Sequence, residues 1–131
     1  MRAVFDTNIF VSALVFLGGK AEAAVFMAAE GRANLIISKP IIHEVLDVLA
    51  RKFERNQEEL ARIAIYLSEL AEVVYPRNKL RVLHDEPDIR ILECAIAGGA
   101  DVIVTGDRAM LSLREYKKIR IISLKEFLQT V

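Results

Sequence analysis

Two patterns of apolar positions alternate along the chain. One is a short unbroken apolar run, and the other is a longer stretch with apolar residues at helical spacing. The apolar runs are rich in Val and Ile and fall at residues 2–5, 35–38, 72–75, 101–105 and 119–123. Helical spacing predicts helices at about 8–16, 20–31, 40–53, 57–71, 87–98, 108–113 and 124–129. Because strands that alternate with helices form parallel sheets, the pattern predicts an α/β fold with a mainly parallel five-stranded sheet.

The strand runs are apolar without alternation, as expected when helices cover both faces of a sheet, so we expect a three-layer α/β/α sandwich. Asn56 followed by Glu59 is a variant of the capping box, and Gly98 and Gly99 are a C-terminal stop for the 87–98 helix. No linker or repeat divides the 131 residues, which predicts one domain over 1–131. Residues assigned to the core include Leu60, Ile63, Leu67 and Leu70, and Phe5, Phe10, Phe16, Phe26 and Phe53.

Four acidic residues fall where a parallel sheet brings them to one edge. Asp6 and Asp107 follow strand runs, while Glu44 and Asp88 lie near the starts of helices that leave from the same edge. Carboxylates crowded together raise one another's pKa unless a cation neutralises them. Since the ligands would all be oxygens, with no second cysteine and no inward-facing histidine, the set favours Mg²⁺ or Mn²⁺ over zinc.

Each acid also has a purely structural explanation. Asp6 and Asp107 stand where an Asp caps a helix, Asp88 suits the first turn of a helix capped by Asp85, and Glu44 suits a solvated helix surface. Helical angles of about 100° per residue favour the metal site, because they place Asp88 inside the apolar stripe of its helix and Glu44 at the border of the core. The same angles place Arg90 and Glu93 on the surface, and His43 and Asp47 on the polar side of the 40–53 helix.

The amino-acid composition excludes several classes of protein. Hydrophobic residues make up 53% of the chain, and 18 basic groups balance 18 acidic ones, which excludes a disordered chain and a globally polycationic binder. The single cysteine, Cys94, excludes an internal disulfide and a Cys-rich zinc site. The longest apolar stretch, from Ile9, is about half the ~20 residues that span a bilayer, and the N-terminus lacks the order of a signal peptide. We expect a cytoplasmic protein without a membrane partner.

At four places the chain resembles the PIN-domain nucleases, especially the VapC-like toxin components of prokaryotic toxin–antitoxin pairs. Asp6-Thr7-Asn8 is similar to the acid that opens the family pattern, and SKPIIHEVLDVL is similar to the helix that carries its glutamate. DIRILECA from Asp88 is similar to the acid-led helix, and VTGD, which ends at Asp107, to the terminal acid motif. The order and spacing of these motifs, over nearly the whole chain, carry the resemblance.

The resemblance implies a metal-dependent endoribonuclease, commonly a homodimer and a toxin restrained by an antitoxin, with Asp6, Glu44, Asp88 and Asp107 binding the ion. It gives Asn8 and Thr105 the role of orienting a carboxylate or a water, although both also suit turn and cap positions. Asp85 is an accessory candidate, for which helix capping is the simpler explanation. Glu93 and Cys94 depart from the small residues more usual in VapC toxins, which leaves the subfamily and the substrate open.

An RNA substrate requires a local cationic surface, because the net charge is zero. Arg108, beside Asp107, suits phosphate steering, whereas a solvated face is the better explanation for the other cations. Two groups of basic residues stand out: Arg108, Arg114, Lys117, Lys118, Arg120 and Lys125; and Arg77, Lys79 and Arg81 before His84.

Three other classes remain as alternatives. A catalytically inactive PIN-like binding scaffold would keep the fold, but the four intact acids speak against it. A receiver-type phosphoacceptor module needs an acid pair after its first strand, where this chain has only Asp6. A phosphatase of the haloacid-dehalogenase type needs a second Asp two residues after the first, where Asn8 stands.

Overall fold

The computed structural model describes residues 1–77 and 86–130, and within them helices and strands alternate as the sequence predicts. Every predicted helix is present, with ends that differ from the prediction by at most two residues. Their order along the chain is β1 (Arg2–Phe5), α1 (Thr7–Val15), α2 (Lys20–Ala29), β2 (Asn34–Ser38), α3 (Lys39–Phe53), α4 (Gln57–Leu70), β3 (Glu72–Val74), α5 (Glu86–Ala97), β4 (Val102–Val104), α6 (Arg108–Leu113), β5 (Glu115–Tyr116), β6 (Ile119–Ile122) and α7 (Leu124–Thr130).

The strands form one sheet with the order β3-β2-β1-β4-β6-β5 across the described part of the chain. All neighbours are parallel except β5 and β6, so the sheet has six strands rather than the predicted five. The missed strand β5 has only two residues and pairs antiparallel with β6 through a tight turn, in which Lys117 and Lys118 adopt positive φ. A segment this short carries no apolar run, so periodicity does not find it.

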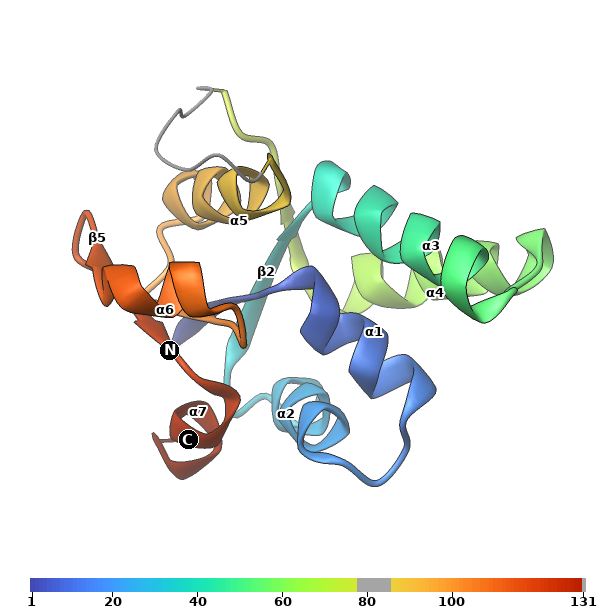
Figure 1. Ribbon diagram of the computed structural model, residues 1–131, viewed down its shortest axis with the longest axis horizontal. Coiled ribbons are helices and arrows are strands. Elements are labelled where there is room, and N and C mark those ends of the chain that lie inside the picture. Colours follow the sequence, from blue (N-terminus) through green and yellow to red (C-terminus); the bar gives the residue numbers. More distant parts are fainter. Residues whose placement is uncertain (78–85, 131) are drawn as a thin grey trace.

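Helices cover both faces of the sheet, as predicted for a three-layer sandwich. Figure 1 shows α5 and α6 on one side of the sheet and α1 to α4 on the other, with α7 packed against α2. The central strands are accordingly buried on both faces: Val4 lies between Ile36 of β2 and Ile103 of β4, and all three side chains have no exposed area.

Local signals explain where the helices begin and end. The Asn56 side chain accepts a hydrogen bond of 2.8 Å from the Glu59 amide, which confirms the predicted cap of α4. The Ser38 hydroxyl accepts a longer one of 3.4 Å from the Ile41 amide at the start of α3. Gly98 follows the end of α5 at a close approach, because a Cβ there would stand 2.5 Å from Cγ2 of Ile36.

The core confirms most of the predicted apolar positions. Phe5 is fully buried, with ring centroids of Phe10 and Phe127 at 5.6 and 5.2 Å from its own. The assignment of Phe16 and Phe26 to the core is wrong: their side chains are 61% and 53% exposed. Phe16 follows the last residue of α1 and makes an edge contact with Phe53 of α3, at 6.3 Å between ring centroids. Phe26 of α2 lines a pocket that Tyr66 of α4 also lines, so neither ring is fully covered.

A helix that spans a membrane must be both long and apolar. No single helix in residues 1–77 and 86–130 is both long enough and apolar enough to cross a bilayer. α1 and α2 pass such a test only as a pair, with a bend of 100° between them.

Candidate functional site

Asp6 and Asp107 follow two strands that lie side by side at the centre of the sheet. β1 pairs with β4, and the Asp6 amide continues this pairing with a hydrogen bond of 2.9 Å to the Val104 carbonyl. From β1 the chain runs outward to β2 and β3 and then returns to β4 on the other side of β1, so the two acids flank a topological switch point. Ligand sites in open α/β sheets lie at this point, beyond the carboxyl ends of the strands.

Thr105 joins the two acidic strand ends. Its hydroxyl Oγ1 donates a hydrogen bond of 2.6 Å to Oδ2 of Asp6 and accepts one of 3.0 Å from the Asp107 amide. The Thr105 side chain has no exposed area, so these two bonds replace the water that would otherwise satisfy it. The structure therefore gives Thr105 the orienting contact that the resemblance assigns to it.

Both acids also cap the helices that follow them, as the structural explanation predicts. Oδ2 of Asp107 accepts a hydrogen bond of 2.9 Å from the Met110 amide at the start of α6. Oδ1 of Asp6 accepts a long one of 3.4 Å from the amide of Asn8, whose residue is exposed. Asn8 thus acts on Asp6 through its backbone, which any residue type would supply.

The pKa of the Asp6 carboxyl is raised above its ordinary value. Burial is the largest cause, since Asp6 is only 7% exposed, and the nearby charge of Asp107 acts in the same direction. The hydrogen bonds from Thr105 and Asn8 oppose this shift of the pKa without cancelling it. An all-oxygen pair of a buried and a half-buried acid with this repulsion fits a hard divalent cation, which would favour the ionised forms of both carboxylates.

An adjoining recess of about 230 Å³ between α1, α3 and α5 is lined by Glu44, and Asp88 follows one of its lining residues in the chain. Glu44 lines it and is half-buried, and Asp88 is 7% exposed in the first turn of α5, as helical angles predict. The recess is also lined by Thr7 and Pro87, the chain neighbours of Asp6 and Asp88. All four predicted acids are therefore at or next to one edge of the sheet.

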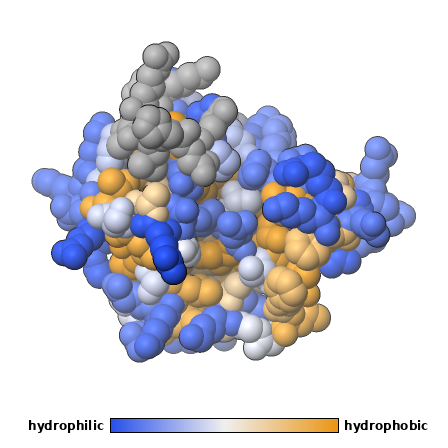
Figure 2. Space-filling model, in the orientation of Figure 1, coloured by the Kyte–Doolittle hydropathy of each residue, from blue (hydrophilic) through white to orange (hydrophobic). Residues whose placement is uncertain are grey.

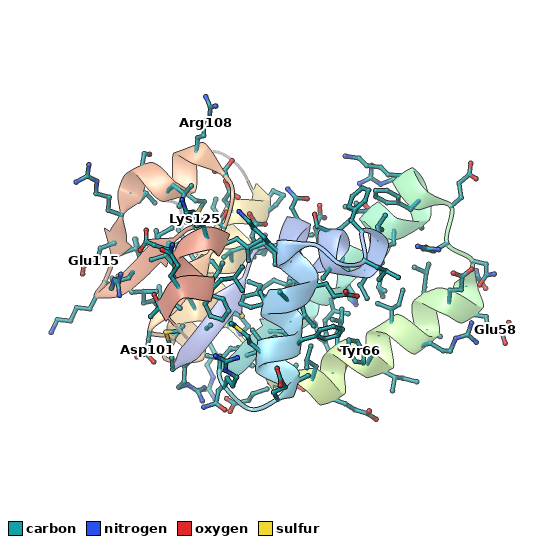
Figure 3. The ribbon with its side chains drawn as sticks, turned by 90° about the horizontal axis from the view of Figure 1, so that it is seen from below. Glu58, Tyr66, Asp101, Arg108, Glu115 and Lys125 are labelled. Carbon is teal, nitrogen blue, oxygen red and sulfur yellow. The ribbon has the colours of Figure 1, made fainter. Side chains whose placement is uncertain are left out.

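The four acids do not form a compact ligand cluster. Among residues 1–77 and 86–130, no three Asp, Glu, His or Cys side chains lie close enough together to hold a metal ion. The structure joins Asp6 to Asp107 through Thr105, and it places Glu44 and Asp88 beside the recess. Asp85, His84, Lys79 and Arg81 lie outside the described residues, and Arg108 is exposed and extends away from the ribbon in Figure 3.

Glu93 differs from the sequence prediction, whereas its partner Arg90 is partly exposed. Glu93 is 6% exposed rather than on the surface, and its carboxylate pairs with Nη1 of Arg90 at 2.8 Å. The helical angle does not take into account the segment after β3, whose residues Tyr75 and Arg77 line the same recess as the pair. The spacing of three residues between an Arg and a Glu on one helix is the signal that could have identified the ion pair.

A family model for the PIN domain matches residues 2–109 of the chain. The chain belongs to the PIN-domain family. The uncharacterized protein MJ1680 of Methanocaldococcus jannaschii is similar over 132 aligned residues, at 30% identity. The alignment covers 95% of this chain and 84% of that protein. The predicted family resemblance is thus confirmed.

Two solved structures have the same fold as this PIN domain. VapBC2 from Rickettsia felis, bound to a DNA fragment from its promoter, contains a chain that matches with a TM-score of 0.66 and 16% identity, over 94% of this chain and 98% of that one. VapBC-1 from nontypeable Haemophilus influenzae matches with a TM-score of 0.66 and 17% identity, over 95% and 99%. The predicted α/β sandwich is therefore confirmed as a PIN fold, of the kind found in VapBC complexes.

Proposed function

We propose that this PIN-domain protein is an endoribonuclease that hydrolyses RNA phosphodiester bonds with Mg²⁺ or Mn²⁺. The observation that carries the proposal is the pair of acids at the switch point, Asp6 and Asp107, held together by the buried Thr105 hydroxyl. A PIN domain that served only as a scaffold would have no need to keep a buried carboxylate whose pKa is raised by burial and by a second acid.

The residues divide into three roles in this proposal. Asp6, Glu44, Asp88 and Asp107 hold the divalent ion, which when bound activates a water and stabilises the leaving oxygen. Thr105 fixes the rotamer of Asp6 through the 2.6 Å hydrogen bond, so that its carboxylate is oriented before the ion and the RNA arrive. Arg108, exposed at the start of α6, attracts the phosphate backbone toward the acids.

The test is cleavage of a structured RNA pool by the purified protein with Mn²⁺, Mg²⁺ or EDTA. Asp6→Asn and Asp88→Asn are expected to abolish cutting and to weaken Mn²⁺ binding in calorimetry. The matched control is Asp47→Asn, which removes an exposed acid of α3 that pairs with Arg51 at 2.8 Å, and it is expected to cut like the wild type. Cleavage that survives in EDTA or in Asp6→Asn contradicts the proposal.

An inactive PIN-like scaffold is the second candidate, because no three described acids meet at ligand spacing. It predicts neither cutting nor Mn²⁺ binding by the wild-type protein. Mn²⁺ binding without cutting of the pool would instead indicate a narrow RNA specificity, which longer natural transcripts can test.

We further propose that the protein is the toxin of a toxin–antitoxin pair. Support comes from the fold shared with VapBC complexes and from an apolar surface at the α1–α2 connection and α4. Figure 2 shows hydrophobic side chains gathered over that connection, and in Figure 3 Tyr66 of α4 points toward α2. Three exposed members of this surface, Leu17, Phe26 and Tyr66, line a pocket of about 160 Å³. Phe16 and Ile65 are further exposed apolar residues of the same connection and helix.

An antitoxin that buries this surface would gain about 25 cal/mol for each Å² of apolar area it covers. Leu17 is the most accessible member at 77%, so Leu17→Lys should prevent the complex without disturbing the core. The measurement is co-purification with the product of the neighbouring gene, together with growth of the host. The variant is expected to lose the partner and still arrest growth; a variant that keeps the partner contradicts this docking surface.

A further inference from the structure

We propose that a single-stranded RNA segment leaves the acidic recess through an adjoining basic groove, where the exposed ring of Tyr75 stacks on a nucleobase. The proposal rests on the proposed ribonuclease function and adds the form of the substrate and the residues that bind it. The groove, called here the Arg90 groove, is lined by Lys39, Pro40, Val74, Tyr75, Pro76, Arg77, Arg90 and Glu93 and has a volume of about 350 Å³.

The Arg90 groove is continuous with the recess that contains Glu44. The two cavities share Pro40 at the start of α3 and Arg90 on α5 as lining residues. Arg90 thus stands between the acids and the groove, where a phosphate next to the cleaved bond would pass. The path follows the carboxyl edge of the sheet, since β2 ends before Lys39 and β3 ends before Tyr75.

The charge of the Arg90 groove suits a phosphodiester backbone. Its lining contains the cations Lys39, Arg77 and Arg90 and one acid, Glu93. Glu93 is buried and paired with Arg90 at 2.8 Å, so its main effect is to hold the guanidinium at the wall of the groove. Its repulsion of an anionic ligand is the smaller effect. A protein without net charge therefore has a local cationic track directly beside its acidic residues.

Tyr75 supplies the contact for a base. The residue is 67% exposed although its neighbour Val74 is buried, and Pro76 restricts the backbone that follows it. Nζ of Lys39 lies over one face of the ring, 6.0 Å from its centroid, so a phosphate held by Lys39 would lie near a base stacked on the other face of Tyr75. Bases are accessible for such stacking in single strands and not inside a duplex, which selects single-stranded RNA.

Fluorescence anisotropy of a labelled single-stranded RNA of about 12 nucleotides in EDTA tests the groove apart from cleavage. Tyr75→Ala is expected to weaken binding about tenfold, and Tyr75→Phe, which keeps the ring face, to retain most of it. Arg77→Gln is expected to lower the slope of log affinity against log salt by about 0.7. Arg62→Gln, an exposed arginine of α4 paired with Glu58, is the matched control and leaves the slope unchanged.

Arg90 needs a separate variant, because removing it alone would break the 2.8 Å ion pair with the buried Glu93 carboxylate. The double change Arg90→Gln with Glu93→Gln removes both charges and keeps hydrogen-bonding groups at both positions. It is expected to lower the salt slope like Arg77→Gln, with a melting temperature close to that of the wild type. An unchanged slope in a folded double variant removes Arg90 from the path.

Measurements of kcat and KM with Mn²⁺ on the same variants distinguish a wrong groove from a wrong proposed function. Tyr75→Ala is expected to raise KM about tenfold and to leave kcat within twofold. A wild type that cuts RNA, with Tyr75→Ala and Arg77→Gln unchanged in affinity and KM, overturns the groove and leaves the ribonuclease intact. A duplex of the same sequence bound as tightly as the single strand overturns the substrate form. A wild type that neither cuts nor binds RNA overturns both.

Discussion

Replacing Thr105 by Val tests whether the two acidic strand ends depend on a single hydroxyl. Thr105 Oγ1 donates to Oδ2 of Asp6 at 2.6 Å and accepts from the Asp107 amide at 3.0 Å, in a side chain without exposed area. A hydrogen bond to a charged group contributes about 1.5–3 kcal/mol, and a buried amide left without its acceptor costs about 1 kcal/mol more. The methyl group that replaces the hydroxyl recovers at most about 0.8 kcal/mol.

The expected net loss in the free energy of unfolding is therefore about 2 kcal/mol, or roughly 7 °C in melting temperature for a chain of this length. The assay is thermal and urea unfolding followed by circular dichroism at neutral pH in EDTA. RNA cleavage should fall about 10- to 100-fold, because the Asp6 carboxylate loses the group that orients it.

The pH dependence separates this explanation from a simple packing defect. Above the raised pKa of Asp6 the hydroxyl binds a carboxylate, whereas below it the acid is neutral and the bond is weaker, so the effect of Thr105→Val should shrink on acidification. Thr105→Ser keeps the hydroxyl and loses one methyl group, which costs about 1 kcal/mol at every pH. A Val variant as stable as the wild type at neutral pH refutes the reasoning, as does a deficit that grows on acidification.

Three further predictions concern single buried groups. Asp6→Asn should melt at a higher temperature than the wild type in EDTA, because the raised pKa of Asp6 means that its ionised form destabilises the fold. This loss of stability develops as pH rises from the ordinary value of 3.8 through the folded pKa, and it persists at every higher pH. Equal melting temperatures at neutral pH would refute the prediction. Gly98→Ala should lose about 1–3 kcal/mol in urea unfolding, since its Cβ would meet Ile36 at 2.5 Å, and an unchanged midpoint would show that Ile36 moves freely. The thiol of Cys94, whose pKa burial raises to about 12, should resist a disulfide-exchange reagent in the native protein and react in urea; fast native reaction would contradict its burial.

The sequence predicted most of the sheet because central parallel strands are apolar on both faces, a pattern that depends on burial alone. Asp6 and Asp107 could be placed together for the same reason: each follows such a run, and the carboxyl ends of parallel strands share one edge. Strand β5 escaped prediction because its pairing depends on a tight turn rather than on apolar residues.

Helical angles predicted burial correctly on the main apolar side of a helix and incorrectly on its other side. Asp88 lies on the side of α5 that faces the sheet, and it is buried as its angle predicts. Glu93 lies about 140° away, yet it is also buried, beside a recess that the segment after β3 lines, and a helical wheel does not contain this neighbour. The opposite error occurred at Phe16 and Phe26, where an apolar stretch predicted core and the neighbouring helices cover the rings only in part.

The bond between Thr105 and Asp6 joins residues 99 positions apart, and this separation sets when the site can exist. Closing so long a loop must precede any contact between β1 and β4, which makes the pairing a late step of folding. On a ribosome that adds roughly 5–20 residues per second, the end of β1 waits roughly 5–20 s for its partner strand. A chain released before β4 carries Asp6 without Asp107, so interrupted synthesis yields fragments that lack the paired acids.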